Sequence, residues 1–202
     1  GESFTTVLRL INEETEEPVS SPIEKVLETG EIVGLANHTA LINRQGEKTP
    51  IADGASPICD PGGQIYGVVM VFRDVTQEKR QREKIEYIMS HDSMTGLFNR
   101  WYMEEVLNRY DQEMQDNCAV IMGDLNGLKL VNDAFGHFEG DRFIRKIATI
   151  LRTSSGPKDV VCRWGGDEFL ILMPNAGAKE AERLIERVLA RCETESDEKL
   201  QL

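Results

Sequence analysis

The sequence has few cysteines, no excess of positive charge and no long apolar run. Its 202 residues include four cysteines, none in a CxxC pair of the kind that binds zinc. Cys118 and Cys162 lie in apolar runs and are predicted to be buried free thiols. The net charge of −12 argues against a nucleic-acid surface or an anionic membrane patch. The negative net charge is still compatible with a nucleotide ligand, because a divalent cation can supply the positive charge that the phosphates need.

No apolar run approaches the length of a membrane-spanning helix, and none has the pattern of a signal peptide. We therefore expect a cytoplasmic chain that contacts neither nucleic acid nor membrane. The chain begins at Gly1 rather than at Met, so we expect it to be part of a longer protein. That longer protein can carry a membrane anchor upstream.

Residues 1–76 have the pattern of a strand-rich module. A short helix is predicted at 22–28, with Ser21 as its N-cap and Gly30 after its end. Three strand candidates that suit an antiparallel meander follow, separated by turns: 38–43, 49–59 and 65–72.

Three features close this module: the turn Asp60–Gly63, the strand 65–72, and Asp74–Val75–Thr76. Together they resemble the C-terminal half of a PAS sensor domain, whose exit motif is Asp-x-Thr. The resemblance implies that the first strands of the sensor lie upstream of Gly1, and it leaves the PAS ligand unknown. An unrelated β-meander is the alternative.

Residues 77–91 are predicted to form a linker helix. Ile85, Ile88 and Met89 give it an apolar stripe. A short coiled coil with a partner chain and a solvated linker helix both fit, because the segment is too short for a sustained heptad pattern.

Apolar periodicity after Asn99, a predicted N-cap, indicates the element order α-β-α-β-β-α. This order suits an α+β sandwich with helices on one face of an antiparallel sheet. The last predicted helix, 179–192, is expected to bury these residues: Ala181, Leu184, Ile185, Val188 and Leu189.

Two apolar runs between Val160 and Pro174 predict a hairpin, and four polar or small residues join them: Gly165, Gly166, Asp167 and Glu168. Both glycines can take the positive φ of a tight turn, and they leave room for a phosphate at the backbone. A solvated acidic hairpin is the alternative to a cation site.

Three carboxylates are predicted to meet at one end of this sheet. Asp124 follows the strand 118–122, and Asp167 and Glu168 lie in the hairpin. Clustered carboxylates repel one another unless a cation neutralises them, and oxygen ligands suit Mg²⁺ or Mn²⁺.

Three polar residues follow Asp124 at positions suited to a nucleotide. Lys129 would add positive charge near a phosphate, while Asn132 and Asp141 would hydrogen-bond a base edge. Each of them alone also fits an ordinary surface position.

Three motifs occur in order within residues 92–192: Asp92–Arg100 (DSMTGLFNR), Asp124–Asp133 (DLNGLKLVND) and Gly165–Phe169 (GGDEF). They resemble the motifs of the GGDEF family, the diguanylate cyclases. The resemblance implies a nucleotide-cyclase-like domain with a ferredoxin-like core over 92–202, truncated at its C-terminus. It would follow a PAS-like sensor (1–76) and a linker helix (77–91).

The resemblance also implies a reaction, in which two GTP molecules on a homodimer condense to cyclic di-GMP and release pyrophosphate. It assigns catalysis to Asp167 and Glu168. It assigns metal binding to Asp124, the Leu125 carbonyl, Asp167 and Glu168. It assigns substrate binding to Lys129, Asn132, Asp141, Gly165 and Gly166.

The sequence departs from the family pattern at two places that bear on activity. The family's later strand and phosphate-binding basic residues would follow Leu202, so we expect this chain alone to be weakly active or inactive. The family's inhibitory site is Arg-x-x-Asp, and here Gly156 stands at the Arg position before Asp159. That site is therefore predicted to be incomplete.

The favoured hypothesis is that the protein is a PAS-regulated diguanylate cyclase. The alternative is a non-catalytic GGDEF module that binds GTP or cyclic di-GMP as a receptor, and a third reading is a pure sensing or dimerisation module. The intact Asp167–Glu168 pair argues against the receptor, and the retained Asp124, Asn132 and Asp141 argue against the third reading.

Overall fold

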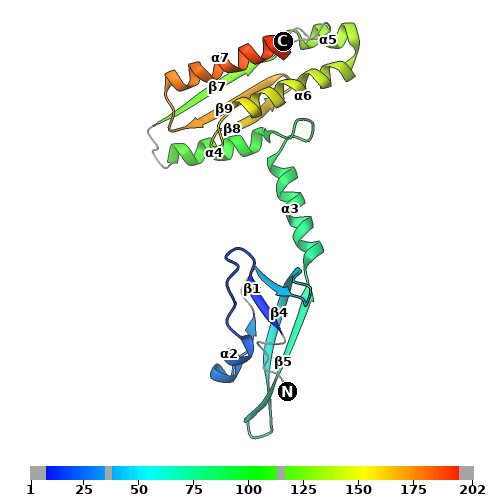
Figure 1. The fold of residues 1–202 in the computed structure, drawn as a ribbon, viewed down its shortest axis with the longest axis vertical. Helices are drawn as coiled ribbons and strands as arrows, with labels where there is room; N and C mark the ends of the chain where they lie inside the picture. Colours follow the sequence, from blue (N-terminus) through cyan, green and yellow to red (C-terminus); the bar gives the residue numbers. More distant parts are fainter. Residues whose placement is uncertain (1–7, 35–37, 113–116, 196–202) are drawn as a thin grey trace. The chain divides into compact units, whose positions relative to one another are not determined.

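The computed structural model describes residues 8–34, 38–112 and 117–195. The chain divides into two compact units between Lys84 and Ile85 (Figure 1). The helix α3 (Thr76–Ser90) spans this division. Within the described ranges, no helix is long and apolar enough to cross a membrane.

The first unit holds a five-stranded antiparallel sheet with one helix against it. The strand order is β1-β3-β4-β2, and β5 also pairs with β4. The helix α2 (Pro22–Thr29) contacts β4 and β5 and buries Val26. The strands are β1 (Arg9–Asn12), β2 (Val33–Gly34), β3 (Thr39–Ile42), β4 (Lys48–Cys59) and β5 (Ile65–Asp74).

The predicted meander is confirmed, because β3, β4 and β5 pair in succession. The predicted helix caps are also confirmed. The Ser21 side chain accepts a hydrogen bond from the Glu24 N–H, and Gly30 ends the helix at φ 71°. The strands β1 and β2 were not predicted, since four and two residues are too few to show an alternating pattern.

The second unit holds a four-stranded sheet in the order β6-β8-β9-β7. The two-residue strand β6 (Phe98–Asn99) runs parallel to β8, and the other pairs are antiparallel. The remaining elements are α4 (Arg100–Gln112), β7 (Cys118–Asp124), α5 (Leu128–Phe135), α6 (His137–Ser154), β8 (Val160–Gly165), β9 (Glu168–Pro174) and α7 (Ala178–Glu195).

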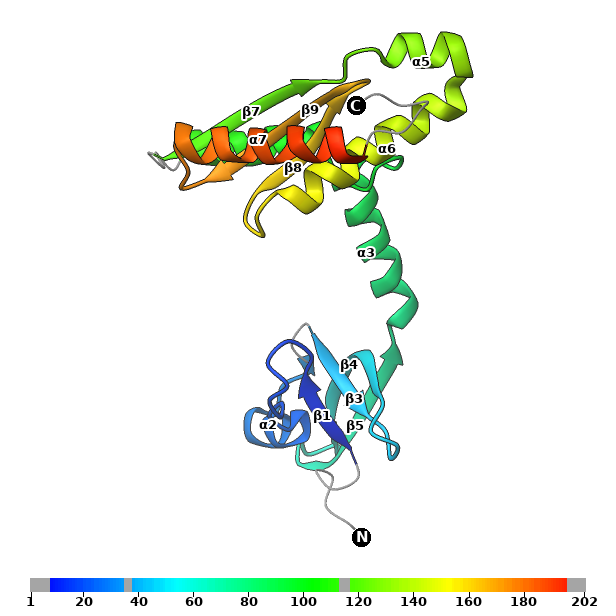
Figure 2. The ribbon, with the colours of Figure 1, turned by 45° about the horizontal axis from the view of Figure 1, so that its top comes forward.

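Helices cover both faces of this sheet, whereas the sequence predicted helices on one face (Figures 1 and 2). Phe143 of α6 and Leu184 of α7 belong to one buried cluster with Ile171. Met103 of α4 packs on the other face with Leu172. The reason is that β9 is buried at five consecutive positions. Its side chains alternate between the faces, so both faces need cover.

The helix α7 buries fewer apolar residues than predicted. Leu184 is 1% exposed, but Ile185 is 41% and Leu189 58% exposed. Both line a cavity of about 450 Å³ beside β7, which is the outer strand of the described sheet. Cys118 begins this outer strand and is therefore exposed rather than buried, whereas Cys162 of the inner strand β8 is buried, as predicted.

The start of α3 is fixed to the first unit by polar contacts. An Asp74 carboxylate oxygen accepts a hydrogen bond from the Thr76 N–H at 2.8 Å. Hydrogen bonds from the Thr76 side chain and from its backbone lower the pKa of Asp74. Lys79, one turn later, forms an ion pair with Glu13 at 2.8 Å. Asp74 therefore joins β5 to the first turn of α3.

We predict that Asp74→Ala frays the first turn of α3 and alters the regulation of turnover that the PAS resemblance implies for the first unit. Loss of such a cap typically costs about 1 kcal/mol of helix stability. Hydrogen exchange of the α3 amides, measured beside GTP turnover, tests this. A frayed helix with unchanged turnover would show that Asp74 is only a cap.

Candidate active site

The Gly-Gly-Asp-Glu sequence forms the turn between β8 and β9, as predicted. Gly165 pairs with Glu168, so Gly166 and Asp167 make the connection in this signature turn (Gly165–Glu168). Gly166 has a φ of 22°, in the region that favours glycine. Gly165 does not adopt the predicted positive φ, because a register shift between Arg163 and Gly165 takes up the irregularity instead.

The outer strand β7 brings Asp124 to the same end of the sheet. Asp124 lies opposite Glu168 in the β7–β9 ladder. The next residue, Leu125, donates its backbone N–H to the Asp167 carbonyl at 3.0 Å. The backbone therefore gathers all four residues to which metal binding was assigned.

These residues do not form a ready-made metal cage. In the ranges that the structure describes, no group of three or more His, Cys, Asp or Glu side chains is arranged to hold a metal ion. Mg²⁺ is usually held by one or two carboxylates together with substrate phosphates. The donor set of Asp124, Asp167 and the Leu125 carbonyl fits that mode.

The junction of α5 and α6 brings Asn132 and Asp141 close together. Gly136 donates its N–H to the Asn132 carbonyl at 2.9 Å and ends α5. The Asn132 side chain lies against Gly140: a Cβ placed on Gly140 would come within 2.0 Å of the Asn132 Oδ1. Gly140 precedes Asp141, so the two residues predicted to bind guanine are neighbours at the start of α6.

Lys129 lies in the first turn of α5 and is exposed. Asp141 is partly exposed, with an Oδ2 atom 3.5 Å from the Arg145 guanidinium. No hydrogen bond or ion pair joins the α5–α6 group to the signature turn within residues 117–195. The structure thus shows two separate groups of predicted site residues, one at the sheet end and one at the helix junction.

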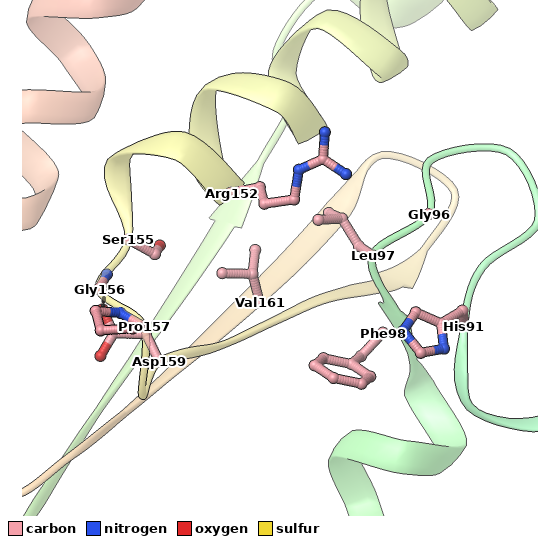
Figure 3. A pocket seen from close by; sticks show the side chains of 10 residues that line it. All are labelled: His91, Gly96, Leu97, Phe98, Arg152, Ser155, Gly156, Pro157, Asp159 and Val161. Carbon is pink, nitrogen blue, oxygen red and sulfur yellow. Dashed lines mark hydrogen bonds between the residues drawn. The ribbon is translucent and has the colours of Figure 1, made fainter. Parts of the chain in front are cut away.

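Asp159 and Gly156 contact each other directly. The Gly156 N–H donates to the Asp159 Oδ2 at 2.7 Å, and the Asp159 N–H donates to the Gly156 carbonyl at 3.1 Å. Figure 3 shows both at one side of a cavity of about 510 Å³, which Arg152 of α6 also lines. The carboxylate that the family would offer to a ligand therefore closes a local turn here.

We predict that cyclic di-GMP inhibits through Asp159 weakly or not at all. Glycine provides no guanidinium at position 156, and the Asp159 carboxylate already has a backbone donor. Progress curves with added product, together with direct titration of product binding, test this. Micromolar inhibition that disappears in Asp159→Ala and in Arg152→Ala, but persists in Lys158→Ala, would show that Arg152 replaces the missing arginine.

Two family models match the chain. Residues 89–201 match the model described as "Diguanylate cyclase, GGDEF domain", and residues 2–80 match a PAS fold. The chain belongs to the GGDEF family. This confirms the predicted family and the predicted fold class, a GGDEF domain preceded by a PAS-like sheet.

Two curated relatives are named as enzymes of cyclic di-GMP metabolism. "Cyclic di-GMP phosphodiesterase PdeB" of Shewanella oneidensis is 34% identical over 128 residues, which are 63% of this chain and 15% of that protein. "Probable diguanylate cyclase DgcE" of Escherichia coli is 31% identical over 150 residues, which are 73% and 14%. The chain therefore spans a small part of these relatives.

The fold also resembles a solved GGDEF structure. The coiled coil and GGDEF domain of DgcB from Caulobacter crescentus, in complex with cyclic di-GMP, aligns with a TM-score of 0.53 and 25% identity. The alignment covers 56% of this chain and 61% of that one.

Sequence reasoning missed Arg163 as a residue of the site. Its Nε and Nη2 atoms donate to the Gly166 carbonyl at 3.1 and 2.8 Å. A charged residue beside the buried Cys162 in an apolar strand was the available signal. Residue spacing could not reveal its partners. Asp92 is 71 positions away in the sequence, and Gly166 lies in an irregular turn.

Proposed function

We propose that this chain is the sensor and GTP-binding part of a diguanylate cyclase. Two GTP molecules, one on each protomer of a homodimer, would condense to cyclic di-GMP. Each ribose 3′-oxygen attacks the α-phosphorus of the other nucleotide. The bond from that phosphorus to the bridging oxygen breaks, and pyrophosphate leaves. The PAS-like unit would regulate this reaction through α3.

The observation that carries the proposal is the joining of the β7 end to the signature turn. The Leu125 N–H bond to the Asp167 carbonyl fixes Asp124 and Asp167 as close neighbours. Asp167 or Glu168 would accept the proton of the attacking hydroxyl. Gly165 and Gly166, which carry no side chains, would leave room for the nucleotide beside the turn.

We propose that Asp124, the Leu125 carbonyl and Asp167, with Glu168 beside them, hold Mg²⁺ or Mn²⁺. Such a cation, when bound with GTP, offsets the negative charge of the phosphates and polarises them. Asn132 and Asp141 would hydrogen-bond guanine, and Lys129 would face the phosphates. Substrate would bring the two groups of residues into one site.

A receptor without turnover is the second candidate. It is favoured by one observation, that a relative 34% identical to this chain is named a cyclic di-GMP phosphodiesterase. A GGDEF match therefore does not by itself decide between synthesis and binding. The complete set of Asp124, Asp167 and Glu168 at the sheet end favours synthesis.

Incubation with GTP and Mg²⁺, followed by chromatography for cyclic di-GMP and pyrophosphate, tests the proposal. Titrations with GTP and with cyclic di-GMP accompany it. A cyclase forms both products, and chelation of the metal stops their formation. Binding of either nucleotide without product, in a protein that also contains any segments flanking this chain, would support the receptor instead.

A further inference from the structure

The segment Asp92–Arg100 has no role in the reaction proposed above, yet it contacts the base of the signature turn. The Arg163 Nη1 atom lies 3.3 Å from an Asp92 carboxylate oxygen. The Arg100 guanidinium lies 4.6 Å from the ring centroid of Trp164, the residue before the turn. The strand β6, within the same segment, pairs with β8 opposite Arg163.

All three guanidinium nitrogens of Arg163 have partners. Nε and Nη2 donate to the Gly166 carbonyl, and Nη1 donates to both Asp92 carboxylate oxygens at 3.3 and 3.4 Å. Only 13% of the Arg163 side chain is exposed. Because the guanidinium is planar and its donors are fixed, it holds the Gly166 carbonyl and the Asp92 carboxylate in one geometry.

This geometry restrains Asp167 from both sides. The Gly166 carbonyl belongs to the peptide plane that precedes Asp167, and Arg163 holds it. The Asp167 carbonyl belongs to the plane that follows, and the Leu125 N–H holds it at 3.0 Å. With both planes held, the direction of the Asp167 side chain depends on Arg163.

Asp92 links Arg163 to the end of α3. It follows α3 by two residues, and its carboxylate accepts hydrogen bonds from the Thr95 N–H at 2.9 Å and the Thr95 hydroxyl at 2.7 Å. Burial acts to raise the pKa of Asp92, but the Thr95 hydrogen bonds and Arg163 outweigh it. The pKa of Asp92 is therefore lowered. The carboxylate is charged at neutral pH and pairs with Arg163 as an ion.

Asn99 fixes the same end of α3. Its Nδ2 atom donates to the Met89 carbonyl at 2.8 Å, and its Oδ1 atom accepts from the Tyr102 N–H at 2.9 Å. One side chain thus ends α3 and begins α4. Tyr87 of α3 also stacks on His91, with ring centroids 4.0 Å apart. These contacts join the end of α3 to the segment that contacts Arg163.

We propose that Arg163 is a positioning residue for Asp167 and that Asp92 couples it to the end of α3, so that a shift of α3 redirects Asp167. The consequence for turnover rests on the proposed function, whereas the mechanical coupling does not. The Leu125 amide reports on the coupling, because its partner is the Asp167 carbonyl.

The test compares Arg163→Lys, Asp92→Asn and the double variant with the unchanged chain, by NMR hydrogen exchange. Lysine keeps the charge but cannot hold both partners in a fork. Exchange of the Leu125 amide is expected to be about tenfold faster in each single variant, because a hydrogen bond to a charged group is worth roughly that factor. The double variant is expected to match the singles, as members of one network do not add.

Two controls separate this effect from general loosening. Ile171 is a buried residue of β9, the strand between β7 and β8. The backbone amides around it should keep their exchange rates. Arg191→Lys should leave Leu125 unchanged, since Arg191 joins α7 to Thr153 of α6 and does not contact the turn. Unchanged Leu125 exchange in Arg163→Lys, or additive effects in the double variant, would overturn the proposal.

Turnover provides the functional arm of the test. Where the protein makes cyclic di-GMP, Arg163→Lys should lower kcat by about 10²-fold with KM for GTP within about threefold, as expected when a reacting group is misplaced. If an unchanged protein that also contains any segments flanking this chain makes no product, the proposed function fails while the exchange data still decide the coupling. An unchanged kcat in Arg163→Lys would refute the positioning role.

Discussion

Asp167→Asn is expected to lower the rate of cyclic di-GMP formation by about 10²-fold or more, and Asp124→Ala by a similar factor. Each change removes a carboxylate from the end of the sheet, where the charge of the transferring phosphate must be balanced. Asn has the same shape as Asp, and the Leu125 bond goes to the Asp167 backbone carbonyl. The turn should therefore keep its conformation.

Steady-state turnover with GTP and Mg²⁺ measures this effect in a protein that also contains any segments flanking this chain, and a thermal melt accompanies it. Asp111→Asn is the matched control, because Asp111 is exposed near the end of α4. The control should retain full activity, and all three variants should melt near the temperature of the unchanged protein. Near-normal turnover in Asp167→Asn would refute the assignment of the site.

Gly140→Ala is expected to weaken GTP binding by about tenfold, the factor for loss of one good hydrogen bond to the base. A methyl group on Gly140 would overlap the Asn132 carboxamide, whose Oδ1 atom would lie 2.0 Å from it. The Asn132 side chain is flexible and would move away, so the fold should survive. Alanine also favours the helix, by about 0.5–1 kcal/mol.

The control for this prediction is the same change in an Asn132→Ala background. If Gly140 matters only because it leaves space for the Asn132 side chain, Gly140→Ala should not weaken GTP binding further in the Asn132→Ala protein. Titration with GTP measures binding without turnover, so the result does not depend on catalysis. A tenfold loss that persists without the Asn132 side chain would show that Gly140 acts in another way.

Local patterns in the sequence were sufficient for several elements and their ends. The apolar run of β9, the Ser21 and Gly30 caps and the turn at Gly165–Glu168 depend on neighbours in the chain, and each was found where expected. Asn99 was predicted as the N-cap of α4, and the structure confirms the hydrogen bond to Tyr102. Short-range signals of this kind are set by residue type and spacing alone.

The contacts that shape the site depend on long-range packing. Arg163 and Asp92 are 71 positions apart, and no local spacing links them. The strand β6 has two residues and exists only because β8 pairs with it. The helix α4 covers its face of the sheet because β9 is buried on both faces. Gly140 comes close to Asn132 because α5 packs on α6. Periodicity predicts an apolar face but not its partner, which is settled only when the elements pack in three dimensions.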